Sequence, residues 1–257
     1  MPGRLRLSPN LPEELARLLE ARGLEPLWAK AKALPGGRGT ARTLTVCGVE
    51  MVVKQEARGG LAGRLLPNLY LGSGPFDKEW ALASRLCCAG LCARPVAQEL
   101  VAVGPFLRVY QATEAVREAA SLMQIWQAGE LQEEHLFRAG RATGRLHRSG
   151  ILHGDLNAGN ILLPEGGKVR FLDLRHSAAF DGPPPLAGRR RNLSRLARSL
   201  HKVHHTRGLA WPSAPWERLA SGYAEGWGER EGWLEEWMKE AAQGFRLRSL
   251  LWTRRGP

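Results

Sequence analysis

The feature that most constrains the fold is a polar segment in the second half of the chain, His153-Gly154-Asp155-Leu156-Asn157-Ala158-Gly159-Asn160. The 257 residues include only four Asp and five Asn, yet two of each lie between His153 and Asp173. Composition is a poor explanation for such a concentration of scarce residues. We therefore interpret the segment as a functional loop rather than as ordinary polar surface.

The spacing within this segment suits phosphoryl transfer. Asn160 follows Asp155 by five residues, and Asp173 stands at the far side of a predicted hairpin. Phosphoryl transfer needs a carboxylate that orients the attacking hydroxyl and accepts its proton, and hard oxygen ligands that hold Mg²⁺ between the phosphates. Asp155 fits the first task, and Asn160 with Asp173 fits the second. The alternative is a polar loop with two structural Asp, an N-cap and a turn residue.

Earlier residues supply the other parts of a nucleotide site. Lys54 ends a predicted strand and is the sole Lys between Lys32 and Lys78, and Glu79 lies on the following predicted helix. A kinase uses such a Lys to hold the nucleotide phosphates and such a Glu to orient the Lys. Ahead of them, the backbone N–H groups of Gly37-Arg38-Gly39 can approach phosphates. These residues form one consistent set in chain order: Gly37-Arg38-Gly39, Lys54, Glu79, Asp155, Asn160 and Asp173.

This set resembles the protein-kinase-like superfamily, whose pattern is H-x-D-x-x-x-x-N followed by D-F-G. Asp155, Asn160 and Asp173 match that pattern, whereas Leu174-Arg175 stands in place of Phe-Gly. The resemblance implies an α+β, bilobal fold with an antiparallel-sheet N-lobe and a mainly helical C-lobe. The lost glycine favours a small-molecule or sugar kinase over a regulated protein kinase. Asn157 points the same way, because Ser/Thr protein kinases usually carry Lys there.

A closer resemblance, over roughly residues 35 to 205, is to the lipopolysaccharide kinases that phosphorylate 3-deoxy-D-manno-octulosonic acid (Kdo) on lipid A precursors. It implies an ATP- and Mg²⁺-dependent enzyme at the cytosolic face of the bacterial inner membrane, with Kdo-lipid A as its acceptor. The segments that carry it are Gly37-Arg38-Gly39, Arg58-Gly59-Gly60-Leu61 through Tyr70-Leu71, Glu79, Gly90-Leu91 through Arg94-Pro95-Val96-Ala97, Asp155 through Leu163, Asn192 through Leu196 and Arg198-Ser199-Leu200.

Two departures leave the acceptor open. Gly159 replaces a frequent His of that family, and Leu174-Arg175 replaces its usual residues after the metal Asp. Both changes bring the loop close to aminoglycoside phosphotransferases, whose H-G-D-x-x-x-x-N pattern is matched too. A soluble small-molecule phosphotransferase is therefore the alternative enzyme. A catalytically silent basic module, such as a pseudokinase or a nucleic-acid binder, is a third hypothesis, but every expected catalytic residue is present.

The net charge is +12, from 37 Lys plus Arg against 25 Asp plus Glu, which favours an anionic partner. Arg accounts for 30 of the 37 cations, so GC-rich coding explains part of the excess. Given the catalytic set, we expect an anionic glycolipid and an anionic membrane surface as partners, and no nucleic acid. No signal peptide or run of about 18 apolar residues is seen, so the predicted membrane association is peripheral.

Candidate acceptor contacts are Asn157 and a set of arginines. Arg189, Arg190 and Arg191 open a predicted helix, although positive charge opposes the helix dipole there. Such charge is typical of a surface that offers guanidinium groups to carboxylate or phosphate. The alternative is a solvated basic face. The residues named as substrate contacts are Asn157, Arg58, Arg191 and Arg195, with Arg198 continuing the same helix face.

The resemblance implies a kinase N-lobe (35–112) and a kinase C-lobe (113–257), preceded by an N-terminal helical extension (1–34). Six tryptophans near the C-terminus are expected mainly to pack between helices, rather than to anchor the protein at a bilayer. His201, His204 and His205 are expected to be ordinary surface or packed histidines, not metal ligands.

The hydrophobic periodicity and the turn residues also predict the secondary structure. Predicted helices are 12–22, 75–89, 113–128, 130–149, 189–206, 214–227 and 230–242. Predicted strands are 41–47, 49–55, 95–103, 106–111, 161–163 and 169–174.

Overall fold

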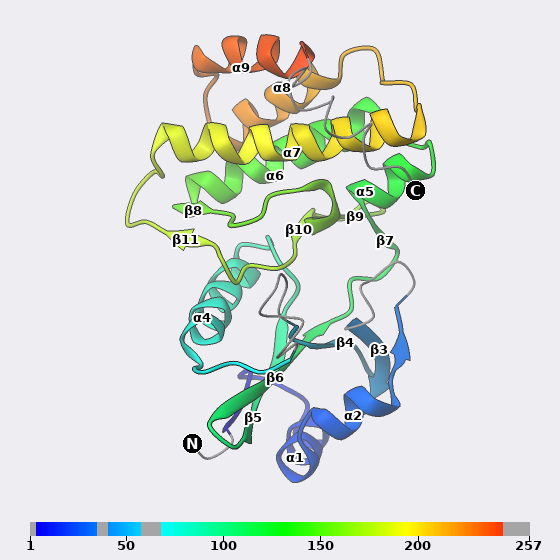
Figure 1. Ribbon diagram of the computed structural model, residues 1–257, viewed down its shortest axis with the longest axis vertical. Helices are drawn as coiled ribbons and strands as arrows, with labels where there is room; N and C mark the ends of the chain where they lie inside the picture. The colour runs from blue at the N-terminus through cyan, green and yellow to red at the C-terminus, as the bar shows by residue number, and fades with distance from the viewer. Residues whose placement is uncertain (1–3, 35–40, 58–67, 244–257) are drawn as a thin grey trace. The chain divides into compact units, whose positions relative to one another are not determined.

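The computed structural model describes residues 4–34, 41–57 and 68–243. The chain divides into two compact units (Figure 1): Met1–Cys88 with Ala93–Val116, and Ala89–Cys92 with Arg117–Pro257. The first unit is built around an antiparallel sheet and the second is mainly helical, which confirms the predicted α+β class. The expected lobe boundaries at residues 35 and 113 stay predictions.

The first unit contains a six-stranded sheet of order β1-β5-β6-β4-β3-β2. The central hairpin is the predicted one, and its turn residues Cys47 and Gly48 both have positive φ, as a two-residue β-hairpin turn requires. β1 and β2 were not predicted, because strands of four and two residues carry little hydrophobic pattern. The strands are β1 (Arg4–Leu7), β2 (Lys32–Ala33), β3 (Ala41–Val46), β4 (Val49–Gln55), β5 (Pro95–Val103) and β6 (Phe106–Glu114).

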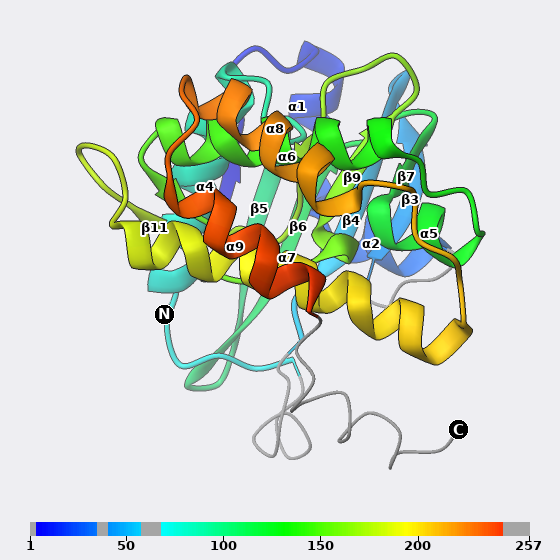
Figure 2. The same ribbon diagram turned by 90° about the horizontal axis from the view of Figure 1, so that it is seen from above.

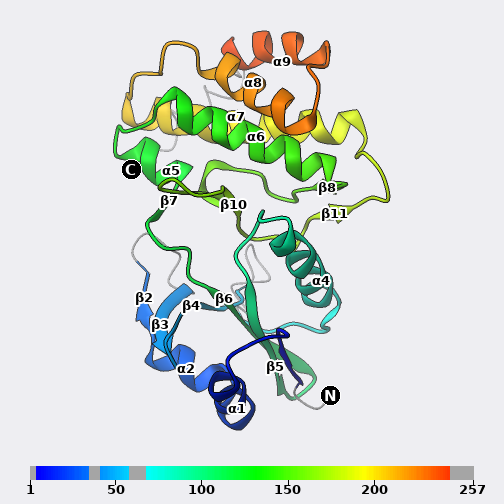
Figure 3. The same ribbon diagram turned by 180° about the vertical axis from the view of Figure 1, so that it is seen from behind.

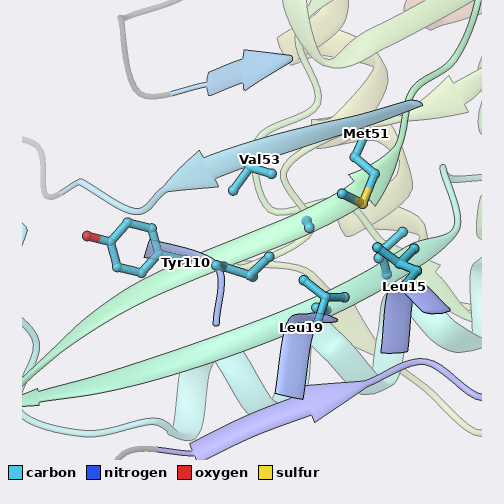
Figure 4. Packing of buried hydrophobic residues seen from close by; sticks show 9 residues of the cluster. Leu15, Leu19, Met51, Val53 and Tyr110 are labelled. Atoms are coloured by element: carbon cyan, nitrogen blue, oxygen red, sulfur yellow. The ribbon is translucent and has the colours of Figure 1, made fainter. Parts of the chain in front are cut away.

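Both faces of this sheet carry buried apolar residues, and helices lie over each face (Figure 3). On one face, Leu15 and Leu19 of α1 (Glu13–Arg22), together with the segment leading into α2 (Glu25–Lys30), pack against Met51, Val53 and Tyr110 (Figure 4). On the other face, Phe76 of α4 (Gly74–Cys88) packs against Leu100, Leu107 and Val109. This second face is the one that carries Lys54.

The helix predicted over 113–128 is wrong in its first half. Residues up to Glu114 continue β6, because Thr113 pairs with Val52 and Arg94 forms an ion pair with Glu114. The helix α5 (Leu122–Gln127) begins only after Ser121, which forms a capping box with Gln124. The prediction placed the N-cap at Thr113, whereas the reciprocal Ser–Gln pair eight residues later is the true start.

The other predicted helices and the hairpin of this unit are confirmed. Figure 2 shows the helices of this unit stacked over one another. The elements are β7 (Ala119–Ser121), α6 (Glu133–Arg148), β8 (Ile151–Leu152), η1 (Ala158–Asn160), β9 (Ile161–Pro164), β10 (Arg170–Phe171), β11 (Ala178–Ala179), α7 (Leu186–Arg207), α8 (Pro215–Trp227) and α9 (Trp233–Ala242). The predicted strand 169–174 is only two residues long, Arg170–Phe171.

Helices α6 and α8 approach each other at two pairs of glycines. Gly140 and Gly144 of α6 are one turn apart, and so are Gly222 and Gly226 of α8. A Cβ atom at Gly140 would overlap the backbone of Leu219, and one at Gly222 would overlap the backbone of Phe137. The absence of side chains at these positions therefore sets the distance between the two helices.

Replacing Gly140 by Ala is expected to lower the free energy of unfolding by about 1–3 kcal/mol, because the added methyl group meets backbone that only a helix shift can move. Chemical denaturation measures the loss. The matched control is Gly232→Ala, since Gly232 has helical φ and ψ and open space around its Cβ position. Equal stability of the two variants would contradict the close packing of α6 and α8.

The described tryptophans of the C-terminal region pack among the helices, as expected. Trp216 and Trp237 are buried, Trp211 and His204 lie in ring contact, and the rings of His201 and Trp216 stack. No group of three His, Cys, Asp or Glu side chains suited to a metal ion is found in the described residues, the three histidines of α7 included. Within that same part of the chain, no helix has the length and apolarity needed to cross a bilayer. Trp252 lies outside the described residues.

Candidate active site

The loop from His153 to Asn160 is held in place by its own side chains. His153 accepts the backbone N–H of Asp155 at Nδ1 (3.0 Å), and its Nε2 donates to the carbonyl of Leu172 (2.9 Å). Burial lowers the pKa of His153, which keeps the ring neutral and leaves Nδ1 free to accept. The imidazole of His153 therefore links Asp155 to Leu172, the residue that precedes Asp173.

Asp155 presents a half-exposed carboxylate at this loop. Its Oδ1 lies 2.7 Å from Nε of Arg195 on α7, and the two side chains are 42% and 48% exposed. Its backbone carbonyl accepts the side-chain amide of Asn160 (2.8 Å). Asp155 is thus fixed by its backbone while its carboxylate faces a cation and solvent, where it is accessible to an incoming group.

Asn160 and Asp173, the two predicted metal ligands, are brought together by the backbone. The N–H of Leu172 donates to the carbonyl of Asn160 (2.9 Å), which places Asp173 beside it. Asp173 has a φ of 56°, and its Oδ1 is buried without a hydrogen-bond partner among the described residues. A buried, unpartnered carboxylate oxygen next to an amide is a donor set that fits Mg²⁺, which takes few protein ligands when phosphates supply the rest.

Two other loop residues are explained by local geometry. The Asn157 side chain accepts the N–H of Gly159 (2.9 Å) and donates to the carbonyl of Asp155 (3.2 Å), so it caps η1. A Cβ atom at Gly154 would overlap the backbone of His176, which returns to the loop through Ser177. Gly154 is therefore required for close approach of the chain after Asp173. A direct contact of Asn157 with an acceptor stays a prediction.

Helix α7 supports the loop through residues to which sequence reasoning gave no role. Asn192 accepts the N–H of His153 (3.0 Å) and donates to its carbonyl (2.9 Å), and Ser199 accepts the N–H of Ala158 (2.9 Å). Asn192 Oδ1 also lies 3.1 Å from Nε2 of the buried His147. The scarcity of Asn in this chain was the available signal for Asn192.

The ring of His147 is neutral, and its tautomer follows from its partners. Because Asn192 Oδ1 is an acceptor, Nε2 of His147 donates to it, and Nδ1 accepts the hydroxyl of Tyr223 (3.0 Å). Burial lowers the pKa of His147 to about 4 and raises the pKa of Tyr223 to about 12. The chain from Tyr223 through His147 to Asn192 links α8 and α6 to the catalytic loop.

This depressed pKa predicts acid sensitivity of the fold. Unfolded His147 titrates near 6.5 and the folded group near 4, so its contribution is fully present above pH 6.5 and is lost as the pH falls toward 4. The loss is on the order of 3 kcal/mol. Urea unfolding at pH 7 and pH 4.5 measures it. A His147→Gln variant should lose less stability over this range than the unaltered protein, and an equal loss would contradict the assignment.

Lys54 lies on the α4-covered face of the first unit. Its Nζ is 3.0 Å from Oε1 of Glu56, a carboxylate only 1% exposed that follows it on the same face. Gln111 stands directly opposite Lys54 in the sheet and donates to Glu79 on α4 (3.1 Å). Glu79 is therefore near Lys54 through a shared neighbour. The orienting role of Glu79 stays a prediction. Glu56 and Gln111 were not predicted as neighbours of Lys54. Glu56 lies on the same face because it is two residues further along the chain, and Gln111 does so because it is the cross-strand partner of Lys54.

The predicted arginine contacts divide into several groups. Arg58 and the segment Gly37-Arg38-Gly39 lie outside the described residues. The expectation that Arg189 and Arg190 face an anionic ligand is wrong: Arg189 is buried against Trp227 and forms an ion pair with Glu231, and Arg190 pairs with acidic residues of α9. Both arginines thus pair with carboxylates of the same unit. Arg191 and Arg195 are exposed.

Comparison with known proteins bears on this arrangement. The family model for the lipopolysaccharide kinase (Kdo/WaaP) family matches residues 27–223. The chain belongs to this family. It is 32% identical over 211 residues to a 3-deoxy-D-manno-octulosonic acid kinase of Xylella fastidiosa, covering 79% of this chain and 84% of that protein. The corresponding kinase of Photobacterium profundum is 31% identical over 193 residues, covering 73% and 80%.

The fold of this Kdo/WaaP family member is shared with a solved structure described as WaaP in complex with acyl carrier protein. The match has a TM-score of 0.56 and 21% sequence identity, and it covers 94% of this chain and 99% of the other. Together, the family and its relatives make this protein a kinase that transfers phosphate to a hydroxyl group. Nucleotide use follows from that activity, and the fold is the kinase-like one expected.

Proposed function

We propose that this protein transfers the γ-phosphate of ATP to a hydroxyl of Kdo in a lipid A-linked acceptor, at the cytosolic face of the bacterial inner membrane. The observation that supports it most is the hydrogen-bond network that fixes Asp155 and Asn160 in one loop and joins Leu172, the neighbour of Asp173, to that loop. The acceptor is inferred from the relatives, which are named as kinases of that sugar. The charge of +12 suits an anionic glycolipid and an anionic membrane surface.

In the proposed reaction, Asp155 orients the sugar hydroxyl and accepts its proton as the oxygen attacks phosphorus. Lys54 holds nucleotide phosphates, with Glu79 orienting it and Gly37, Arg38 and Gly39 approaching them by backbone N–H groups. Asp173 and Asn160 would hold Mg²⁺, which neutralises charge on the transferred phosphoryl group when bound. Acceptor contacts are assigned to Asn157, Arg58, Arg191 and Arg195.

Incubation of the purified protein with labelled ATP, Mg²⁺ and Kdo-lipid A tests the acceptor. We expect label in the glycolipid and none in an aminoglycoside supplied in its place. Label in the aminoglycoside but not in the lipid would overturn the acceptor and favour the soluble phosphotransferase, to which the His153-Gly154-Asp155 motif is also suited. No label in either, with no ATP binding in a thermal-shift assay, would favour the silent binding module.

A further inference from the structure

Helix α7, which supports the catalytic loop, has an unusual charge. Its 22 residues contain Arg189, Arg190, Arg191, Arg195, Arg198, Lys202 and Arg207, with no Asp or Glu. Like charges spaced along one helix repel, so such a sequence needs partners from elsewhere. Acidic residues of the segment before α9 and of α9 itself answer Arg189 and Arg190. Four other cations of α7 lie on its solvent side.

Four of the cations form one line along the helix, which we call the basic stripe: Arg191, Arg195, Arg198 and Lys202. At about 100° per residue they fall within an arc of about 60°, and the line is about 16 Å long. Arg191, Arg195 and Lys202 are exposed and Arg198 is half-buried. Leu193 and Leu200 lie on the opposite, buried side of α7. The stripe is therefore a solvent-facing surface of the long helix seen in Figure 1.

The stripe is directly connected to the catalytic loop. Asn192 and Ser199, which hold that loop, lie on the side of α7 adjacent to the stripe. Arg195 stands between them and gives its Nε to the Asp155 carboxylate at 2.7 Å, while its side chain stays 48% exposed. A hydroxyl bound at Asp155 would thus belong to a molecule whose remaining groups lie within reach of the stripe.

We infer that the basic stripe binds the phosphate groups of the glycolipid that carries the acceptor sugar. This inference rests on the proposed function and adds which surface reads the acceptor. Guanidinium groups and a lysine ammonium bind phosphate oxygens through charge-assisted hydrogen bonds, and exposed sites of this kind select phosphorylated over neutral ligands. Arg191 and Lys202 lie at the two ends of the stripe, away from Asp155, so they contribute to binding and not to chemistry.

The test compares two acceptors and two variants. The acceptors are Kdo-lipid A and the same glycolipid with its lipid A phosphates removed. In a double variant, Arg191→Gln with Lys202→Gln, we expect the KM for the phosphorylated acceptor to rise about fivefold to tenfold more than the KM for the dephosphorylated acceptor. The matched control is Arg207→Gln, an exposed cation of the same helix outside the stripe, which should change neither KM more than about twofold.

An equal change in KM for both acceptors, or no change for either, would overturn the inference. A second result would also overturn it: the unaltered protein binds anionic phospholipid vesicles, the double variant does not, and the two have the same KM for the glycolipid in detergent. The stripe would then bind the membrane and not the acceptor. Equilibrium binding of the two glycolipids without ATP repeats the comparison without turnover. If the unaltered protein binds both glycolipids but phosphorylates neither, the proposed function fails. The stripe is still tested, because the affinities of the unaltered protein and of the double variant for the two glycolipids can be compared.

Discussion

An Asp155→Asn variant is expected to lower kcat about a thousandfold while leaving the unfolding temperature nearly unchanged. Removal of a positioned proton acceptor typically costs about 10²- to 10⁴-fold in rate, and Asn retains the shape of the side chain without its basicity. The backbone carbonyl that holds Asn160 is kept. Among the described residues, the substitution removes a half-exposed ion pair with Arg195, and such pairs contribute about 0–1 kcal/mol.

Phosphate transfer to Kdo-lipid A measures this effect, and thermal unfolding in the presence and absence of Mg²⁺ and ATP checks the variant's integrity. Because the role proposed for Asp155 concerns the hydroxyl and not the nucleotide, the stabilisation by Mg²⁺ and ATP should be retained. The matched control is Asp181→Asn, a change at an Asp beyond the loop, with full activity expected. Retention of more than about a tenth of the activity by Asp155→Asn would show that another group accepts the proton.

Replacing Asp173 by Asn is expected to have two opposite effects: activity falls about a thousandfold, and the protein without Mg²⁺ becomes more stable by about 1 kcal/mol. The Oδ1 of Asp173 is buried with no hydrogen-bond partner among the described residues, and a buried polar atom without a partner is costly. Its φ of 56° is left-handed, a conformation that Asn tolerates. We therefore expect the carboxylate to lower folding stability when the proposed metal site is empty.

Chemical denaturation in Mg²⁺-free buffer measures the change in stability, and thermal shift with Mg²⁺ and ATP measures the loss of metal binding. The unaltered protein should gain about 2.7 kcal/mol at a hundredfold excess over Kd, and the variant should gain little. Asp181→Asn again serves as the control for loss of one negative charge. If Asp173→Asn were less stable than the unaltered protein without metal, the carboxylate would have a structural partner, and the metal assignment would lose its main support.

Most of the secondary structure followed from the sequence because long elements repeat their hydrophobic pattern. The helix predicted from 113 failed for a physical reason: Thr113 is a plausible N-cap in isolation, but its backbone completes the ladder with Val52. The short strands β1 and β2 exist because neighbouring strands provide partners, not because of their own residues. Such tertiary pairing leaves no local signal.

The candidate site shows the same division. Spacing and scarcity predicted Asp155, Asn160 and Asp173 as site residues, because the chemistry of phosphoryl transfer uses such side chains in that order. The arginines were harder to interpret, since a guanidinium reads the same in sequence whether it meets Glu231 inside the protein or solvent outside it. For that reason Arg189 was grouped with cations that a ligand could meet, although it pairs with Glu231.

The sequence by itself determined the class of reaction and the α+β, kinase-like fold, because scarce catalytic residues and hydrophobic periodicity are both local in the chain. Only the tertiary structure decided what holds the catalytic loop and which cations remain exposed. Asn192, His147 and Tyr223 come from three different helices, and they act on His153 only because packing places them together. Burial and pairing depend on neighbours distant in sequence, so residue type alone cannot specify them.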